Sequence, residues 1–183
     1  MNKIISNFEN SFNKAEELRN KGKLTEAIEI FKNILKENSN FHPALNNIAN
    51  CYFQLNQLEQ AEKYYLECLK MGKNILTFNN LSLLYLKRKN FKKALPILQE
   101  SLKIRSNQEQ IIEKIAYCLT ELNLNSEVEV FCKKFLKVYP DNNVILSYYR
   151  RVLFKIGKHQ EGLKAYKKES GIIELDHDKV NIL

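Results

Sequence analysis

A repeated spacing of small residues is the strongest constraint that this 183-residue sequence places on its fold. One series consists of Ala15, Ala49, Ser82, Ala116 and Arg150, and a second consists of Ala27, Ala61, Ala94, Val128 and Gly162. In both series the successive positions are 34, 33, 34 and 34 residues apart. A period of this length is typical of helical repeat proteins, in which each unit buries an apolar face against the next unit.

Large apolar residues accompany both series at helical spacing. Tyr52 and Tyr85 follow the first series by three residues, and Phe31 and Tyr65 follow the second series by four. Offsets of three and four residues place side chains on one face of an α-helix. Each repeat is therefore expected to be a pair of amphipathic helices whose small residues allow close approach.

On these residues, the sequence resembles the tetratricopeptide repeat family over about residues 8 to 170. The second and third units match best, and the third has Phe78, Leu81, Ser82 and Tyr85 ahead of Ala94 and Leu98. The family's Trp is absent from every unit, whereas Pro140 matches its terminal proline. The resemblance implies an all-α fold, a right-handed superhelical solenoid of antiparallel helix pairs with about ten helices.

We expect five units within an array over residues 1–170, at about residues 8–41, 42–74, 75–108, 109–142 and 143–170. The fifth unit departs from the pattern, because Arg150 replaces a small residue and Gly162 replaces Ala; terminal capping units are often atypical. Residues 171–183 form a tail without helical period, which we interpret as a strand or hairpin. Because the tail and the groove are both partly apolar, we also hypothesise that the tail occupies the groove of its own chain.

Composition and targeting signals favour a soluble protein. The hydrophobic share is 44% and the charged share 27%, and no apolar run approaches the roughly 20 residues of a membrane span. The N-terminus lacks the apolar core of a signal peptide, so we expect a cytoplasmic protein. The four cysteines form no C-x-x-C pair, which favours buried, reduced thiols over disulfides or a zinc site.

The net charge of +8 is unevenly distributed. Residues 1–74 carry 10 basic and 9 acidic side chains, and residues 75–183 carry 19 and 12. A basic C-terminal half suits an acidic partner or a nucleic acid. No interleaved aromatic platform for bases accompanies the basic runs, so nucleic-acid binding is a minor alternative.

Arrays of this family enclose a concave groove lined by the first helix of each unit. Packing residues are excluded from that surface by their register. Amide side chains on the surface can hold a peptide backbone beside an apolar stripe. Gln54 and Lys87 lie on this surface together with the predicted groove residues. The predicted groove residues are Asn46, Asn47, Asn50, Phe53, Asn79, Asn80, Leu83, Leu86, Glu113, Tyr117, Arg151 and Phe154. The alternative for each aromatic residue is a place in the core between repeats.

The resemblance suggests two further comparisons. Asn13, Asn47 and Asn80 recur where some family members have an asparagine ladder that holds peptide backbone, although the same residue is common as a structural choice. Other members grip a C-terminal carboxylate of chaperones with cations from three first helices. Here the first unit offers Phe12 and Glu16 on that face, so we exclude that function.

No arrangement of residues points to catalysis, a metal or a cofactor. His42, His159 and His177 fall in separate units or the tail, and no nucleophile triad, zinc-binding H-E-x-x-H or Gly-rich phosphate loop is present. The sequence thus predicts a non-catalytic adaptor that binds a protein or peptide partner. The alternative is an accessory module of a larger or associated enzyme of transferase or oxygenase type, in which the tail begins a catalytic domain.

Overall fold

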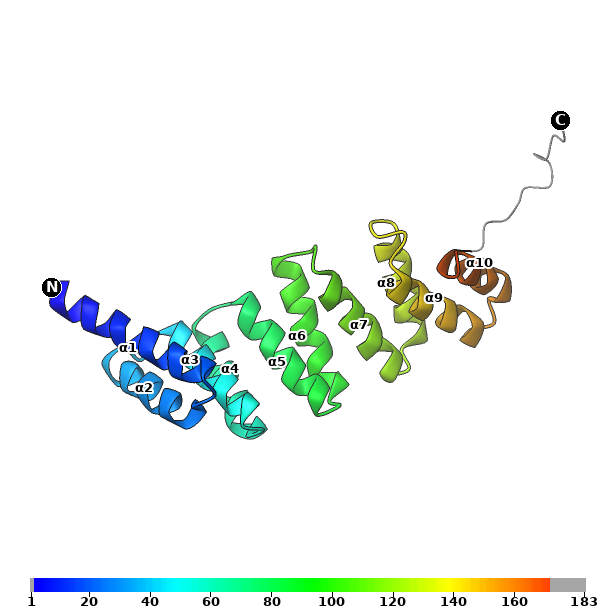
Figure 1. Ribbon diagram of the computed structural model, residues 1–183. Coiled ribbons are helices and arrows are strands. Elements are labelled where there is room, and N and C mark those ends of the chain that lie inside the picture. Colours follow the sequence, from blue (N-terminus) through cyan, green and yellow to red (C-terminus); the bar gives the residue numbers. More distant parts are fainter. Residues whose placement is uncertain (1, 172–183) are drawn as a thin grey trace, which may run out of the picture. The chain divides into compact units, whose positions relative to one another are not determined.

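The computed structural model describes residues 2–171, and the side chains of residues 8–171. These residues form ten α-helices and no strand (Figure 1), which confirms the predicted all-α fold. The helices are α1 (Asn2–Asn20), α2 (Leu24–Glu37), α3 (His42–Gln54), α4 (Leu58–Met71), α5 (Ile75–Lys87), α6 (Phe91–Ile104), α7 (Glu109–Glu121), α8 (Asn125–Leu136), α9 (Asn143–Lys155) and α10 (His159–Glu169). The predicted strand or hairpin, and the hypothesis that the tail fills the groove, fall outside the described residues.

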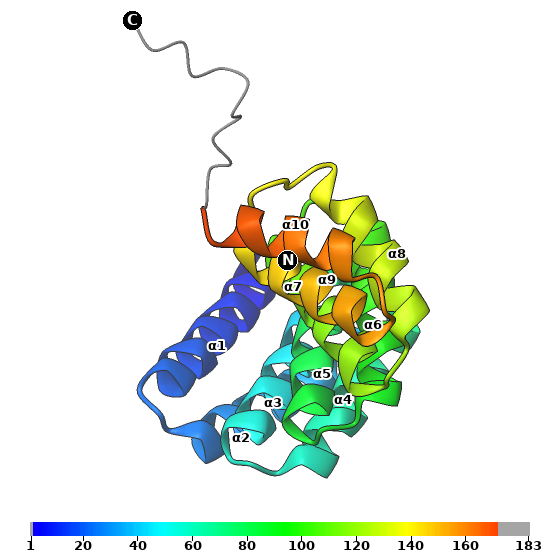
Figure 2. The same cartoon turned by 90° about the vertical axis from the view of Figure 1, so that its right-hand side faces the viewer.

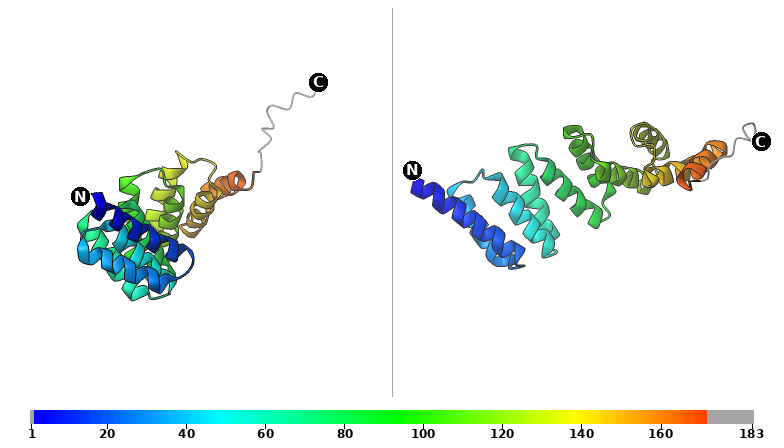
Figure 3. Two further views of the ribbon diagram at one scale, coloured as in Figure 1. Left: turned by 60° about the vertical axis from the view of Figure 1, so that its left-hand side comes forward. Right: turned by 45° about the horizontal axis from the view of Figure 1, so that its top comes forward.

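The chain forms two compact units, the first ending at Ser106 and the second beginning at Asn107. In the first unit α1 pairs with α2, α3 with α4, and α5 with α6 (Figure 3). In addition, α3 contacts both α1 and α5, so the first helices of the three pairs form one layer. In the second unit α7 pairs with α8 and α9 with α10 (Figure 2), and α7 contacts α9.

The turn inside each helix pair contains one residue with a left-handed backbone. These residues are Gly22 (φ 77°), Asn56 (φ 58°), Lys89 (φ 53°), Asn123 (φ 57°) and Gly157 (φ 81°). In every case the next N–H bonds back to the last turn of the preceding helix, as Lys23 N does to Leu18 O at 2.9 Å and Asn90 N to Tyr85 O at 2.8 Å. This hydrogen bond satisfies a backbone carbonyl at the end of the first helix. The chain therefore reverses its direction in the same way in all five helix pairs.

The two series of small residues lie where the paired helices touch. Ala15, Ala49, Ser82 and Ala116 are 0% exposed, as are Ala27, Ala61 and Ala94. A larger side chain at these sites would separate the helices of a pair, which is why the spacing is a reliable mark of the fold. The four cysteines are also buried and free, and burial raises the pKa of Cys132 to about 12.

The last pair accommodates its two departures from the pattern. Nε of Arg150 donates to Oε2 of Glu169 at 2.6 Å, and its guanidinium carbon lies 5.6 Å from the centre of the Tyr166 ring. Gly162 is buried, and a Cβ atom there would lie 3.2 Å from the ring of Phe154. The arginine is therefore held by α10, and the glycine makes room for an aromatic ring.

Candidate peptide-binding pocket

A small pocket in the first unit collects several of the predicted groove residues. Its volume is about 280 Å³, and α1, α3, α4 and α5 all contribute to its wall. The lining residues are Arg19, Asn50, Phe53, Gln54, Tyr65, Asn80 and Leu83. Asn50, Phe53, Asn80 and Leu83 belong to the predicted groove, and the structure brings these four together.

The Asn50 amide is fixed by two hydrogen bonds to its oxygen. Oδ1 accepts from the Tyr65 hydroxyl at 2.6 Å and from Nδ2 of Asn80 at 2.9 Å. Burial raises the pKa of Tyr65, which is 1% exposed, so its hydroxyl keeps the proton that it donates. No described residue accepts from Nδ2 of Asn50 or donates to Oδ1 of Asn80, and the pocket thus offers one amide donor and one amide acceptor.

Arg19 enters the pocket from α1. Its Nη1 donates to Oδ1 of Asn47 at 2.6 Å, and its Nη2 donates to Oδ1 of Asn20 at 3.3 Å. Nη2 also lies 3.8 Å from Oε1 of Glu16, and the arginine side chain is 23% exposed. The guanidinium is therefore held in place by three neighbours while it still lines the pocket.

Three further predicted asparagines connect helices of the first unit. Asn47 is 6% exposed, and its Nδ2 donates to Glu16 at 3.4 Å in addition to the bond from Arg19. Oδ1 of Asn46 accepts from Thr77 at 3.2 Å, and Oδ1 of Asn79 accepts from Ser101 at 2.6 Å. These contacts join α3 to α1 and α5, and α5 to α6. The predicted role of the three amides in binding stays a prediction.

In the first unit, the apolar residues of the predicted groove lie on α3 and α5. Phe53 is half-buried, and Nζ of Lys87 lies 5.1 Å from the centre of its ring. Leu83 is 41% exposed, and Leu86 is half-buried. An exposed leucine beside an aromatic ring is the kind of surface that accepts an apolar side chain.

The remaining predicted residues belong to the second unit and do not line this pocket. Oε1 of Glu113 accepts from Nδ2 of Asn142 at 3.2 Å. Tyr117 is 36% exposed, and the guanidinium carbon of Arg151 lies 5.6 Å from the centre of the Tyr148 ring. Phe154 packs against Gly162. Binding by these four residues therefore stays a prediction that is separate from the pocket.

Sequence reasoning missed two residues of the pocket. The register predicts Tyr65 as a packing residue, which it is, but not that its hydroxyl reaches Asn50. The sequence does contain a signal for Arg19. It follows Ala15 by four residues, as Phe53 follows Ala49. The same register therefore places both side chains on the inner layer.

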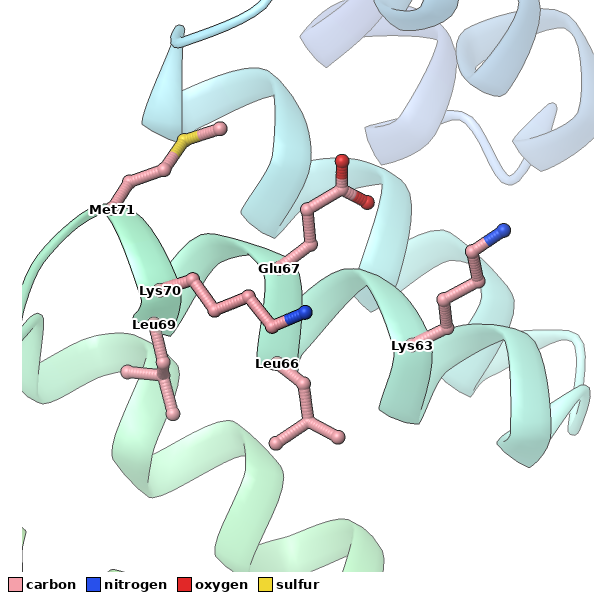
Figure 4. Close-up of a pocket in the computed structure, with 6 residues that line it drawn as sticks. All are labelled: Lys63, Leu66, Glu67, Leu69, Lys70 and Met71. Carbon is pink, nitrogen blue, oxygen red and sulfur yellow. The ribbon is translucent and has the colours of Figure 1, made fainter.

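A larger hollow of about 770 Å³ lies along α4 (Figure 4). Its wall consists of Lys63, Leu66, Glu67, Leu69, Lys70 and Met71. All six residues come from one helix, and Figure 4 shows Leu66 and Leu69 projecting from one side of it and Glu67 and Lys63 from the other. Its described lining comes from one helix, whereas four helices line the pocket, so this hollow is the poorer candidate for a binding site.

The described residues include one close pair of a cysteine and a histidine. Sγ of Cys68 lies 3.6 Å from Nδ1 of His42. Burial raises the pKa of Cys68, which is 1% exposed, so the sulfur remains a thiol and is closed to substrate.

Among the described residues no three His, Cys, Asp or Glu side chains are grouped so that they could hold a metal ion. Within residues 2–171, no helix has the length and apolar character that a bilayer span requires.

The architecture defines a protein built from repeated helical hairpins. Two models of the tetratricopeptide repeat match residues 8–41 and 43–107, which together make up more than half of the chain. The chain therefore belongs to the tetratricopeptide repeat family. No curated protein matches it in sequence.

Solved structures of similar fold have little sequence in common with the chain. A structure of the MamA protein is 15% identical with a TM-score of 0.76, and the match covers 96% of this chain and 97% of that one. MamA from Desulfovibrio magneticus RS-1 is 14% identical with a TM-score of 0.73, covering 90% and 93%. YrrB, described as a TPR protein with an unusual peptide-binding site, is 20% identical with a TM-score of 0.74, covering 92% and 87%. At such identities the likeness concerns the fold alone.

Proposed function

We propose that this protein is a non-catalytic interaction scaffold that binds an extended segment of a partner protein in the pocket of its first unit. The observation that carries the proposal is the pair of amides from Asn50 and Asn80. A peptide group needs one donor for its carbonyl and one acceptor for its N–H. Nδ2 of Asn50 and Oδ1 of Asn80 supply these two groups, and the Asn50–Asn80 hydrogen bond keeps them adjacent.

The surroundings of the two amides support a peptide as the ligand. Phe53 and Leu83 flank them with partly exposed apolar surface, which suits the side chain next to the bound peptide group. The volume of about 280 Å³ is smaller than most sites for whole small molecules. Proteins of this repeat family act by binding protein or peptide partners, and YrrB, with its peptide-binding site, has the same fold.

The proposal is tested by selecting ligands for the full chain from a library of random peptides displayed on phage. A selected peptide is then synthesised with a fluorescent label, and its affinity is measured by fluorescence anisotropy. Leu83→Ala and Phe53→Ala are expected to weaken binding about tenfold or more, because they remove the apolar wall. Leu66→Ala is the matched control, since Leu66 on α4 is 39% exposed and Leu83 is 41% exposed.

Two results would overturn the proposal. One is a selection that yields no peptide with measurable affinity for the folded protein. The other is a set of peptides whose affinity is unchanged by Phe53→Ala and Leu83→Ala, whether or not it is reduced by Leu66→Ala. Circular dichroism of each variant confirms that a loss of binding does not reflect a loss of fold.

A further inference from the structure

The charges around the pocket are of one predominant sign, and they indicate what kind of segment it selects. We infer that the pocket binds a segment in which an acidic side chain neighbours an apolar one, with the carboxylate held by Arg19. The inference rests on the proposed function and adds the chemistry of the partner. Each step depends on a side chain at the pocket or its rim.

Arg19 is positioned to receive a carboxylate. Asn47 and Asn20 use two of its five N–H groups. Both contacts are to neutral amide oxygens, which orient the guanidinium without cancelling its charge. An oriented, partly buried guanidinium binds carboxylates better than a flexible one, because less side-chain freedom is lost on binding.

A second cation, Lys87, lies over the ring of Phe53. Nζ of Lys87 lies 5.1 Å from the ring centre, and Lys87 forms no ion pair with any described residue. Two nearby basic residues, Arg88 and Lys93, do form ion pairs, both with Glu62. Residues 75–106 contain seven basic side chains and one acidic side chain. Lys87 therefore adds a positive charge at the rim of the pocket. Acidic residues of the pocket do not offset this charge.

Glu16 is the one acidic side chain close to Arg19 in the described contacts. Its Oε1 lies 3.8 Å from Nη2 of Arg19, and its side chain is 39% exposed. At this distance and exposure the Glu16–Arg19 pair is weak. A peptide carboxylate with direct hydrogen bonds to Arg19 therefore costs little when it replaces this contact. Glu16 nevertheless repels an incoming carboxylate, and its neutralisation should favour binding.

The same contacts favour a peptide over a nucleic acid. Binding of single strands relies on aromatic faces on which bases stack. The ammonium group of Lys87 lies over the ring of Phe53, which leaves that ring poorly placed for stacking. An acidic peptide uses both features, since its carboxylate contacts Arg19 and its apolar neighbour contacts Phe53 and Leu83.

The experiment uses the peptides selected on the full chain and three matched variants. Arg19→Gln should weaken binding about tenfold, since it removes the charge-assisted hydrogen bonds. Glu16→Gln should strengthen binding about twofold, because it removes the repulsion and keeps an oxygen that accepts from Asn47. Lys63→Gln, which removes one positive charge from α4, should leave the affinity within about twofold of wild type.

The peptides themselves provide the second test. We expect Asp or Glu beside an apolar residue in most selected sequences, and replacement of that acid by Asn or Gln should cost about as much as Arg19→Gln. The effects should not add when both changes are combined. Affinity should also fall as the salt concentration rises.

Different results overturn the acidic preference and the binding of peptides as such. Peptides that bind through Phe53 and Leu83 but show no acidic preference, or that are insensitive to Arg19→Gln, overturn the inference and leave the proposed function standing. A single-stranded oligonucleotide that displaces the peptides with higher affinity also overturns the inference. Absence of any peptide whose affinity depends on Phe53 and Leu83 overturns both.

Discussion

Among single residues, Asn50 shows how one amide serves the fold and the binding surface together. Its oxygen accepts from Tyr65 and Asn80, which joins α3 to α4 and α5. Asn50 also lines the pocket, and no described residue accepts from its amide nitrogen. Loss of this side chain should therefore affect stability as well as affinity.

We predict that Asn50→Leu lowers the free energy of unfolding by about 1 to 3 kcal/mol, because the buried Tyr65 hydroxyl loses its acceptor. Tyr65→Phe alone should cost about 1 kcal/mol. In the Tyr65→Phe background, Asn50→Leu should cost clearly less than it does alone, since no buried hydroxyl is then left without an acceptor. Urea denaturation of the four proteins measures the coupling, and strictly additive costs would contradict the hydrogen bond.

Between helices, the left-handed turn residues set the reversal within each pair. Glycine occupies this position in the first and last pairs, whereas Asn56, Lys89 and Asn123 occupy it in the other three. Asparagine tolerates a left-handed backbone better than most residues do, and lysine has no such advantage. Lys89 is therefore the most strained of the five turn residues.

Lys89→Gly should raise the free energy of unfolding by about 0.5 to 1 kcal/mol, because relief of the left-handed strain exceeds the added freedom of the unfolded chain. Gly157→Ala should have the opposite effect and cost about 1 kcal/mol. Thermal unfolding followed by circular dichroism compares both variants with wild type. Destabilisation by Lys89→Gly would show that the lysine side chain contributes more than its backbone costs.

A cluster of charges connects α4 with α5 and α6. Glu62 lies 2.6 Å from Nη1 of Arg88 and 2.9 Å from Nζ of Lys93, and it accepts from the Tyr85 hydroxyl at 2.9 Å. Burial acts to raise the pKa of Glu62, but these hydrogen bonds and the two positive charges outweigh it, so the pKa lies below its ordinary value. The cluster thus stabilises the junction of two helix pairs when Glu62 is ionised.

Because the pKa of Glu62 is lower in the folded chain than in the unfolded chain, its contribution is complete above about pH 4.5 and is lost as the pH falls through the folded pKa. We predict that Glu62→Gln costs about 1 to 2 kcal/mol at neutral pH. The difference from wild type should shrink progressively below about pH 4.5. Urea denaturation at several pH values measures this difference, and a cost that does not change with pH would rule out the ionised form as its source.

The helix pairs follow from the sequence because their period is set by the packing residues themselves. The register from Ala49 and Ser82 also predicts that Asn50, Phe53, Asn80 and Leu83 share a surface, which the pocket brings together. The hydrogen bond that Asn47 accepts could not be predicted in this way, since its donor, Arg19, lies 28 residues earlier in the chain. The left-handed backbone of Lys89 cannot be predicted from the sequence either, because lysine has no preference for that conformation.

For the whole molecule, the described pocket residues belong to the first of the two compact units. The first unit contains three complete helix pairs, and the described residues that line the pocket all lie between positions 19 and 83. The predicted groove residues Glu113, Tyr117, Arg151 and Phe154 all belong to the second unit. A fragment of the chain can therefore decide whether the pocket is sufficient for binding.

We predict that residues 1–106 form a folded helical protein, because three stacked repeats bury a continuous core of their own. The fragment should bind a pocket-selected peptide within about threefold of the full chain, and Arg19→Gln should weaken binding equally in both. Anisotropy and circular dichroism measure the two properties. A folded fragment that has lost the affinity would assign part of the binding site to residues 107–183. Leu83→Ala in the fragment provides the control that residual binding still uses the same pocket.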